Sequence, residues 1–450
     1  MKPLVELEVE KLAPGGWGLA RPAGGGTVLL PGFLPGEKVR VEPVGPSGGA
    51  RRVRVLELLA ASPDRAEPDC PLAGRCGGCG FLHVRPAAAL ALKARAALGD
   101  LADRAGLALE LIPSPQPERY RARATFHLGR GAEGRWSPGF YDDRRHLVVV
   151  GDCRLLAPAL TALLPPLADW AGRLPPEAGA ELEIGLAAES PGPGRQIVIS
   201  PPSPPPRPFG RRGGPAGRPP ALPPALEPFL AGLAAEFERL DPAAALFARP
   251  FRGAAPRRLG PAGPDRLVAA TWPRWNLALT AEPGGFTQVN PGLNRLMVEK
   301  ILALAAPLAP GRALDLYSGL GNIAVPLLHS GFAVTAVEEA PESAAAARRN
   351  GRGRPGFTVV RGRSLEVTAE LARRGQNFDL VVLDPPRAGA RGLAPLVAAL
   401  KPKLILYLAC HPAVLDRDLP AFTSLGRPLK ALIALDMFPR TSRLEALAAL

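Results

Sequence analysis

The chain has 450 residues, enough for two or three domains with separate hydrophobic cores. It carries 55 Lys and Arg against 41 Asp and Glu, and the resulting net charge of +14 indicates a polyanionic partner, most simply a nucleic acid. The N-terminal sequence MKPLVELEVEKL lacks the apolar core of a signal peptide, and no run of 18 apolar residues occurs. These features argue against a membrane-spanning or disulfide-rich secreted protein, and we expect a cytoplasmic one with no membrane partner.

The first sixty residues contain short segments that predict β-strands. Turn sequences rich in glycine and proline separate these segments at nearly regular spacing, as is typical of small all-β modules. We expect a small closed β-barrel of a class often used to bind single-stranded nucleic acid, although a β-module with no particular function explains the pattern equally well. The predicted strands cover residues 4–12, 27–30, 37–44 and 51–59.

Three of the five cysteines are crowded into the stretch CPLAGRCGGCG, as Cys70, Cys76 and Cys79. The other two, Cys153 and Cys410, lie far downstream. Three close thiols are one short of a four-ligand metal site, so a distant cysteine is expected to complete the set. The spacing alone is ambiguous about the metal, because four thiolates suit tetrahedral zinc as well as an iron–sulfur cluster.

A helical pattern follows the cysteines and predicts a helix over residues 87–112. A mixed region then extends from about residue 119 to 270. Within it, residues 200–224 are rich in proline and arginine and predict a flexible basic loop, most simply a solvated insertion without a function.

After residue 270, apolar strand-like runs alternate with alanine-rich helical runs, which predicts a mainly parallel sheet covered by helices on both faces. The first of these strands leads into the sequence LDLYSGLGN, where Gly319 and Gly321 allow a tight turn before a helix that starts near Asn322. The second strand ends at Glu338, 19 residues after Gly319, where an acid can accept hydrogen bonds from both hydroxyls of a ribose. The turn lacks the glycine pattern of pyrophosphate and triphosphate sites, which favours a nucleoside such as S-adenosylmethionine; a surface glutamate is the alternative.

Two further strands are expected to bring polar residues to the same edge of the sheet. One ends in Asp384-Pro385-Pro386-Arg387, where rigid prolines present the carboxylate of Asp384 to the crevice. Enzymes that methylate amino groups have an aromatic residue in place of Arg387, so an exocyclic amine is a less favoured target. The next strand ends at Cys410, which is either an inert buried thiol or a reactive one that the neighbouring His411 helps to ionise.

Taken together, these motifs resemble the RNA uracil-5-methyltransferase family, particularly its bacterial iron–sulfur 23S rRNA branch, over nearly the whole chain. The N-terminal segment with APGGWGLAR resembles the family's RNA-binding TRAM barrel. The other matching motifs are C-x5-C-G-G-C at residues 70–79, F-x-Q-x-N at 286–290, the glycine turn at 317–322, DPPR at 384–387, YLACHPAVLDRD at 407–418 and DMFPRTSRLE at 436–445.

The resemblance implies roles for individual residues. Cys410 would add to carbon 6 of uracil, Glu445 would later remove the proton from carbon 5, and Asp384 would orient the base and cofactor. The S-adenosylmethionine site would consist of Gln288, Tyr317, Gly319, Asn322, Glu338, Ser364 and Asp384. One 4Fe–4S cluster would be held by Cys70, Cys76, Cys79 and Cys153.

The chain departs from the family pattern at several positions. His411 replaces an asparagine, Leu82 a glutamine and Arg443 a histidine, while Ser364 stands where the family tends to have Asp or Asn near the adenine. A serine is a shorter partner, so these departures bear on cofactor affinity and activity.

We therefore expect a multidomain α/β enzyme that methylates carbon 5 of a specific uridine in RNA, most simply 23S rRNA, and acts as a monomer. The predicted parts are a TRAM-like barrel over 1–62, a central iron–sulfur α+β region over 63–270 and a class I, Rossmann-like methyltransferase domain over 271–450, on which the helix at 87–112 is expected to pack. The alternatives are a transfer-RNA uracil-5-methyltransferase and a non-catalytic, zinc-containing RNA-binding protein.

Overall fold

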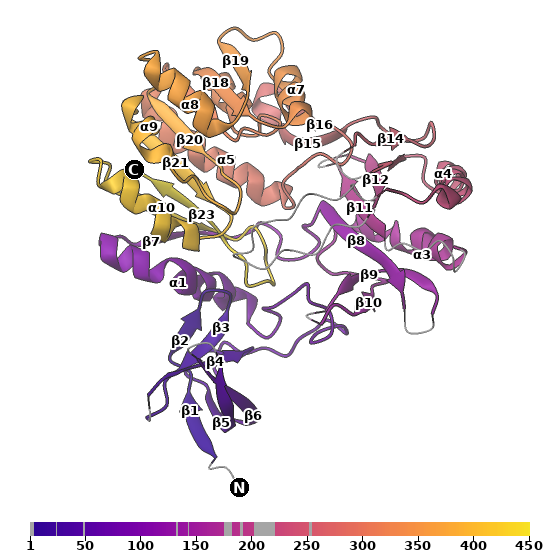
Figure 1. Cartoon of the computed structure of the whole chain (residues 1–450), viewed down its shortest axis with the longest axis vertical. Helices are drawn as coiled ribbons and strands as arrows, with labels where there is room; N and C mark the ends of the chain where they lie inside the picture. Colours follow the sequence, from indigo (N-terminus) through magenta and orange to yellow (C-terminus); the bar gives the residue numbers. More distant parts are fainter. Residues whose placement is uncertain are drawn as a thin grey trace.

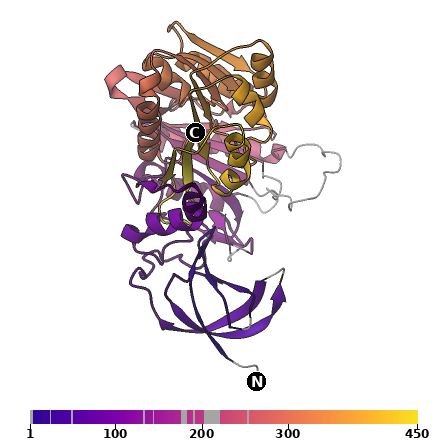
Figure 2. The same ribbon diagram turned by 90° about the vertical axis from the view of Figure 1, so that its left-hand side faces the viewer.

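The structure is a computed structural model that describes residues 4–450 except 24, 48–49, 132–133, 143, 175–181, 190–191, 202–220 and 252–253. Most of the proline-rich segment predicted at 200–224 therefore lies outside the described residues. Figures 1 and 2 show three bodies: an N-terminal sheet at one end of the long axis, a central sheet, and a large C-terminal sheet with helices on both faces. In the described chain, no helix is long and apolar enough to cross a membrane.

The N-terminal body is a six-stranded sheet in the order β1-β5-β6-β4-β3-β2. The segment predicted as one strand at 4–12 forms two strands, and a third strand follows where a turn was expected. Alternate residues such as Leu7, Val28 and Val39 are buried in a core of the module's own, as the two-residue repeat of a strand requires. The strands are β1 (Val5–Glu8), β2 (Lys11–Ala13), β3 (Trp17–Ala20), β4 (Thr27–Pro31), β5 (Lys38–Ser47) and β6 (Ala50–Ala60).

The prediction of a helix through residue 112 is wrong at its C-terminal end. Helix α1 (Pro86–Ala105) stops because Gly106 adopts a left-handed conformation with φ 65°, and its N–H caps the last carbonyls of the helix. The chain then forms strand β7 (Leu109–Ile112), which pairs in parallel with β22 (Ala431–Leu435) at the edge of the C-terminal sheet. Helix α1 packs on the same sheet, so this early segment joins the C-terminal body.

The central body is a seven-stranded sheet in the order β10-β9-β8-β11-β12-β13-β14. Residues of β8 such as Phe126 and Leu128 pack in a hydrophobic core with helices α3 and α4, whereas Arg123 and Thr125 point to the opposite face. Its elements are β8 (Arg123–Arg130), β9 (Trp136–Tyr141), β10 (Leu147–Val149), α2 (Pro158–Thr161), α3 (Leu164–Gly172), β11 (Leu182–Ala188), β12 (Arg195–Ser200), α4 (Glu227–Leu240), β13 (Ala244–Ala248) and β14 (Arg257–Arg258).

The C-terminal body is an eight-stranded sheet in the order β19-β18-β17-β20-β21-β23-β22-β7, and its first five strands are parallel. Helices α5 and α6 cover one face together with the hairpin of β15 (Leu267–Trp272) and β16 (Leu277–Ala281), and α1, α9 and α10 cover the other. The remaining elements are α5 (Pro291–Ala305), β17 (Arg312–Leu316), α6 (Ala324–His329), β18 (Ala333–Glu338), α7 (Pro341–Asn350), β19 (Phe357–Arg361), α8 (Ser364–Arg373), β20 (Leu380–Leu383), α9 (Leu393–Ala399), β21 (Leu404–Ala409), α10 (Ala413–Thr423) and β23 (Glu445–Ala449).

Candidate active site

One cavity of about 620 Å³ lies at the carboxyl ends of the parallel strands of the C-terminal sheet. The order of the strands reverses between β17 and β20, and ligands of open α/β sheets bind at such a point. The structure brings together here every residue predicted for catalysis or cofactor binding. The cavity is lined by Gln288, Tyr317, Gly319, Asn322, Glu338, Ser364, Asp384, Cys410 and Glu445.

The glycine turn after β17 is tied to the end of β18 through Glu338. Its carboxylate accepts hydrogen bonds from the N–H of Gly319 at 2.9 Å and from the N–H of Ala340 at 2.8 Å. A carboxylate has about four acceptor positions, so acceptor capacity remains for a ligand's hydroxyls. Gly321 has φ 90°, and a Cβ there would lie 2.8 Å from Val325 Cγ2, so both the backbone and the packing require glycine.

Helix α5 contributes a cavity residue that the sequence motifs did not reveal. Asn294 is 1% exposed and exchanges two hydrogen bonds with Asn322, at 2.9 and 2.8 Å. This pair fixes the orientation of the Asn322 side chain beside the glycine turn. Asn290, the last residue of the F-x-Q-x-N motif, instead caps α5 by accepting a hydrogen bond from the N–H of Leu293 at 3.1 Å.

Strand pairing brings Cys410 and Glu445 to the same end of two neighbouring strands. Strands β21 and β23 are antiparallel, and Ala409, the last residue of β21, lies opposite Ala446. Cys410 follows Ala409 and Glu445 precedes Ala446, and both residues line the cavity. A thiol and a carboxyl group are therefore presented to the same cavity.

Two carboxyl groups of the cavity, those of Glu445 and Asp384, hold their protons unusually strongly. Burial raises the pKa of Glu445 to about 8, and the nearby Asp384 adds to the shift. Burial also raises the pKa of Asp384 to about 6. Asp315, a buried residue of β17 outside the cavity lining, has a pKa raised well above its usual value by burial and by Asp384. Such crowding of acids favours a ligand that brings positive charge.

A basic group that favours the Cys410 thiolate is Arg387. Burial, followed by Glu445 and Asp384, raises the pKa of Cys410, and the guanidinium of Arg387 opposes that rise. Arg387 lines the cavity, although it is exposed, as His411 is. The last residue of the DPPR motif is therefore a second basic group that can act on the thiol, and the role expected for His411 stays a prediction.

The loop that leads to Glu445 is anchored by a buried lysine of helix α1. Lys93 is 3% exposed and forms an ion pair with Asp436, the first residue of the DMFP motif. Its ammonium group also donates to the carbonyl oxygens of Phe438 and Arg443, both at 3.3 Å. Because these carbonyls flank the approach to Glu445, α1 helps to position the candidate base.

A second cavity, of about 400 Å³, adjoins the first and is lined by Cys70, Cys76, Cys79 and Cys153. Phe438 lines both cavities. Burial, followed by the charges of the other three thiols, raises the pKa of Cys79 to about 12. Within the described ranges, no three His, Cys, Asp or Glu side chains are grouped so that they could hold a single metal ion.

Known proteins resemble this chain along almost its whole length. The 23S rRNA (uracil(1939)-C(5))-methyltransferase RlmD of Pseudomonas putida is 32% identical over 98% of the chain and 92% of its own length. The protein of the same name from Thiobacillus denitrificans is 30% identical, covering 100% of the chain and 99% of that relative. The chain belongs to the 23S rRNA (uracil-C5)-methyltransferase family. The predicted membership of the RNA uracil-5-methyltransferase family is thereby confirmed, although no protein-family model matches the chain.

The fold of this family member is also that of a solved methyltransferase. A tRNA (uracil-54, C5)-methyltransferase of Pyrococcus abyssi, crystallised with S-adenosyl-L-homocysteine, superposes with a TM-score of 0.71 at 20% identity, covering 99% of this chain and 100% of that one. The expected α/β methyltransferase fold is thus confirmed for this 23S rRNA (uracil-C5)-methyltransferase homologue.

Proposed function

We propose that the protein transfers the methyl group of S-adenosylmethionine to carbon 5 of one uridine in 23S rRNA, through a covalent adduct with Cys410. The observation that carries the proposal is that Cys410 and Glu445 line one cavity together with the residues expected to bind the cofactor. The relatives are named for uracil 1939, and we propose the same position here. Ribosomal RNA is made in the cytoplasm of bacteria, where we place the enzyme.

The chemistry begins with activation of the pyrimidine ring, because carbon 5 of uracil is a poor nucleophile. The thiolate of Cys410 forms a bond to carbon 6, and the electron pair displaced from the 5,6 double bond makes carbon 5 nucleophilic. S-adenosylmethionine supplies an electrophilic methyl group on a sulfonium centre. After carbon 5 has taken that methyl group, Glu445 removes the proton from the same carbon, the double bond re-forms and the thiolate leaves.

The acid-rich cavity suits a cationic cofactor. The sulfonium and ammonium groups of S-adenosylmethionine would bring positive charge to the cavity lined by Asp384 and Glu445. Positive charge nearby lowers the pKa of a carboxyl group, so occupancy of the site favours the ionised, basic form of Glu445. Glu338, with acceptor capacity left, would hold the ribose, and Ser364 at the start of α8 would face the adenine.

We propose that the four thiols of the second cavity hold one 4Fe–4S cluster. Support comes from the convergence of Cys70, Cys76, Cys79 and Cys153 on one cavity, together with the match of their motif to the iron–sulfur branch of the family. A cationic group would relieve the mutual repulsion of the four thiols when they are ionised. A cluster also spans more widely placed sulfur atoms than a single zinc ion, whose four sulfur ligands lie about 2.3 Å from the metal. Anaerobically purified protein should be brown with a broad absorption band at about 400 nm; a colourless, zinc-loaded preparation would contradict the proposal.

We also propose that the chain acts as a monomer with three parts: a TRAM-like RNA-binding module at 1–62, a central region at 63–270, and a catalytic domain at 271–450 to which α1 and β7 are added. The separate core of the N-terminal sheet supports this division. Deletion of residues 1–60 should weaken RNA binding and leave cofactor binding intact. Loss of both together would show that the module belongs to the folding unit of the catalytic domain.

Mass spectrometry of RNA from cells with and without the gene tests the proposed function. Loss of one 5-methyluridine from 23S rRNA, restored by the wild-type gene and not by a Cys410→Ala variant, is the expected result. Loss from transfer RNA instead would favour a tRNA uracil-5-methyltransferase. No change in either RNA class would favour a non-catalytic RNA-binding protein.

A further inference from the structure

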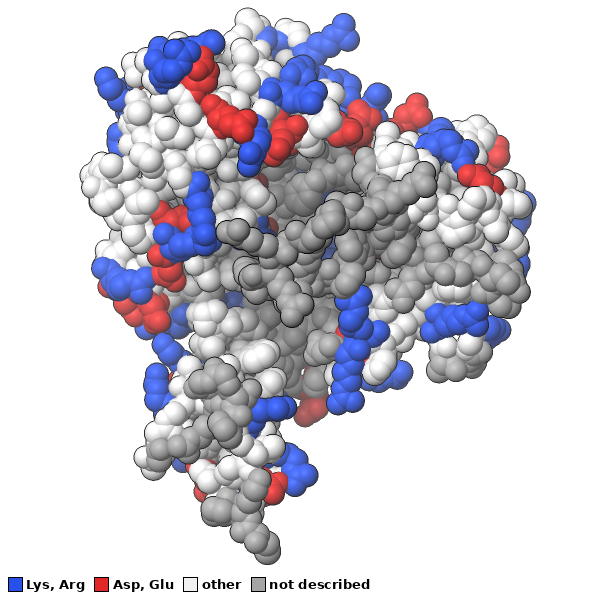
Figure 3. Space-filling model, viewed as in Figure 1, with Lys and Arg blue, Asp and Glu red and all other residues white. Residues whose placement is uncertain are grey.

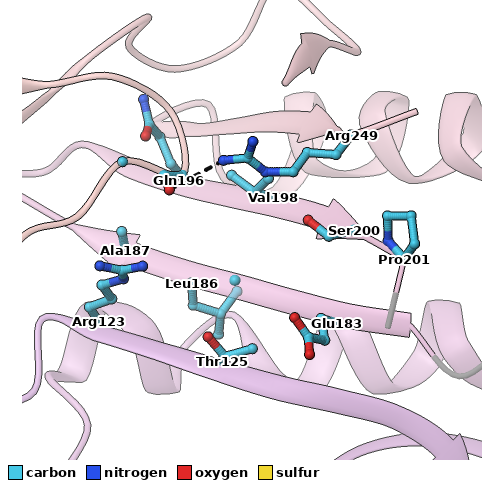
Figure 4. Close-up of a pocket in the computed structure, with 13 residues that line it drawn as sticks. Arg123, Thr125, Glu183, Leu186, Ala187, Gln196, Val198, Ser200, Pro201 and Arg249 are labelled. Atoms are coloured by element: carbon cyan, nitrogen blue, oxygen red, sulfur yellow. Dashed lines mark hydrogen bonds between the residues drawn. The ribbon is translucent and has the colours of Figure 1, made fainter. Parts of the chain in front are cut away.

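The central sheet has two faces of different character. Helices α3 and α4 pack on one face, where residues such as Ile184, Ile197 and Ile199 are fully buried. The alternate residues of the same strands point to the other face, as the two-residue repeat requires. These residues are largely small or polar and line a cavity of about 410 Å³ (Figure 4).

Two arginines approach this cavity from opposite sides (Figure 4). Arg123 begins β8, and Arg249 follows β13. Arg249 is held in place by hydrogen bonds to the carbonyl oxygens of Ala254 at 2.6 Å and Gly284 at 3.3 Å. The rim is completed by the glycines of the loop that follows β16.

Arg123 has neither an ion pair nor a hydrogen bond to a carboxylate in the described part of the chain, and its one aromatic contact is Phe286, with the guanidinium carbon 5.4 Å from the ring centroid. Burial, with a contribution from Arg249, lowers the pKa of Arg123, although a guanidinium remains charged at neutral pH. The positive charge of Arg249 thus acts on Arg123 across a partly desolvated cavity. An anion bound between the two guanidinium groups would relieve the repulsion and could accept two parallel hydrogen bonds from an arginine.

Among the described lining residues, the one carboxylate lies away from Arg123. On β11, Ala187 is the residue opposite Arg123, whereas Glu183 is opposite His127. Four residues along a strand correspond to about 13 Å. Figure 4 accordingly shows Glu183 beside Ser200 and away from Arg123, so the end of the cavity beside Arg123 is accessible to an anion.

This cavity adjoins the catalytic one through a single short loop. Gly284 and Gly285 line the arginine cavity, and Phe286, the next residue, lines the catalytic cavity. The Phe286 ring is 65% exposed and lies against Arg123. Phe286 and Arg123 therefore lie where the two cavities meet.

We propose that the cavity between Arg123 and Arg249 binds a phosphodiester group of the RNA strand that flanks the target uridine. The proposal rests on the proposed function, because it takes RNA as the substrate. Net charge does not by itself locate this contact: on the face shown in Figure 3, Lys and Arg side chains are spread over the molecule among Asp and Glu. Acids outnumber basic residues in the lining of the neighbouring catalytic cavity, so the separate basic site beside it is the better position for a phosphate of the RNA backbone.

The test uses the full-length protein and a 23S rRNA fragment that contains the target uridine. Arg123→Gln removes the positive charge, whereas Arg123→Lys keeps the charge and loses the two parallel donors of the guanidinium. The matched control is Arg239→Gln, at an exposed position of helix α4 on the opposite face of the sheet. Arg123→Gln should weaken RNA binding about 10- to 100-fold at low salt and make the slope of log affinity against log salt shallower by about 1. Arg123→Lys should retain the slope, and the control should behave as the wild type. Cofactor affinity measured by calorimetry should be the same in all four proteins.

A second arm identifies the phosphate. Single linkages near the target are replaced in turn by neutral methylphosphonates; the wild type should lose affinity at one linkage, and Arg123→Gln should be insensitive at that same linkage. An unchanged salt slope for Arg123→Gln, or equal sensitivity of both proteins at every linkage, would overturn the proposal. Failure of the proposed function is seen separately, as absence of 5-methyluridine formation by the wild type, since RNA binding and its salt slope are measured without catalysis.

Discussion

The two adjoining cavities use cysteine in opposite ways. In the thiol cavity, Cys79 is surrounded by three further thiols, and burial together with their charges raises its pKa to about 12. In the catalytic cavity, Cys410 is the single thiol among the lining residues and has carboxyl groups and Arg387 as its neighbours. Several thiols that repel one another as anions suit a bound metal group. A single thiol beside a base and a cation suits a nucleophile that adds to a substrate and is later eliminated.

The comparison also separates two ways of building a site. The catalytic residues stand at the ends of strands β17, β18, β20, β21 and at the start of β23, where sheet register places them. The cysteines stand on loops, and ion pairs hold their surroundings: Arg440 pairs with Asp69 and Glu118, and Arg154 pairs with the same two acids. The backbone of Arg440 also accepts a hydrogen bond from Phe81 at 3.1 Å, which joins the cysteine segment to the loop that carries Glu445.

The largest expected effect comes from replacing one cysteine of each cavity by alanine. Cys410→Ala should reduce methylation by at least about 10³-fold, because no second thiol is present among the described residues that line the cavity, and should leave iron content and cofactor affinity unchanged. Cys153→Ala should lose iron and keep Cys410 reactive toward alkylating reagents. Both predictions are checked by measuring iron content and single-turnover methylation of the two variants. A Cys410→Ala variant that lacks iron would contradict the separate roles of the two cavities.

Glu445→Gln should stabilise the protein at high pH and also impair catalysis, as expected of a buried base in the catalytic cavity. The pKa of Glu445 is raised from 4.5 to about 8, so its contribution to stability is present below about pH 4.5 and is lost as the pH rises through about 8. At pH 9 the wild type holds a buried, ionised carboxylate that glutamine lacks. The variant without cofactor should exceed the wild type in free energy of unfolding by roughly 2–4 kcal/mol at pH 9 and hardly differ from it at pH 5. Equal denaturation midpoints at pH 9 would mean that Glu445 is solvated.

Arg387→Gln should produce the smallest effect, a shift in pH dependence. Loss of the guanidinium removes the group that lowers the pKa of Cys410, so alkylation of Cys410 should require a pH higher by less than about 1 unit. Arg391→Gln, an exposed change in the same loop, is the control. Alkylation profiles that coincide for Arg387→Gln and the wild type would show that Arg387 does not act on the thiol.

Residues at strand ends were predictable from the sequence because a parallel sheet gathers the carboxyl ends of its strands on one edge. Gly319, Glu338, Asp384 and Cys410 all follow from this rule, and they line one cavity. Glu445 was placed by a family motif, and its position near Cys410 depends on the pairing of β21 with β23, which the sequence pattern does not reveal.

Contacts between distant segments could not be predicted. Lys93 and Asp436 are 343 residues apart, and nothing in the pattern of α1 distinguishes this buried lysine from one on a solvated face. Asn294 lies within a helix without a motif of its own, and its role depends on how α5 packs beside the glycine turn. Strand β7 was read as helix because its residues continue an apolar pattern, and its pairing with β22 is a tertiary effect.

The central claim, a covalent bond between Cys410 and carbon 6 of uracil, is tested most directly with RNA that carries 5-fluorouridine at the target. Fluorine on carbon 5 cannot be removed as a proton by Glu445, so the reaction stops after methyl transfer with the enzyme still attached. With S-adenosylmethionine present, denaturing electrophoresis should show a stable protein–RNA complex, and mass spectrometry should map the linkage to Cys410. A Cys410→Ala variant that still methylates ordinary RNA, or a complex linked through a cysteine of the thiol cavity, would contradict the account.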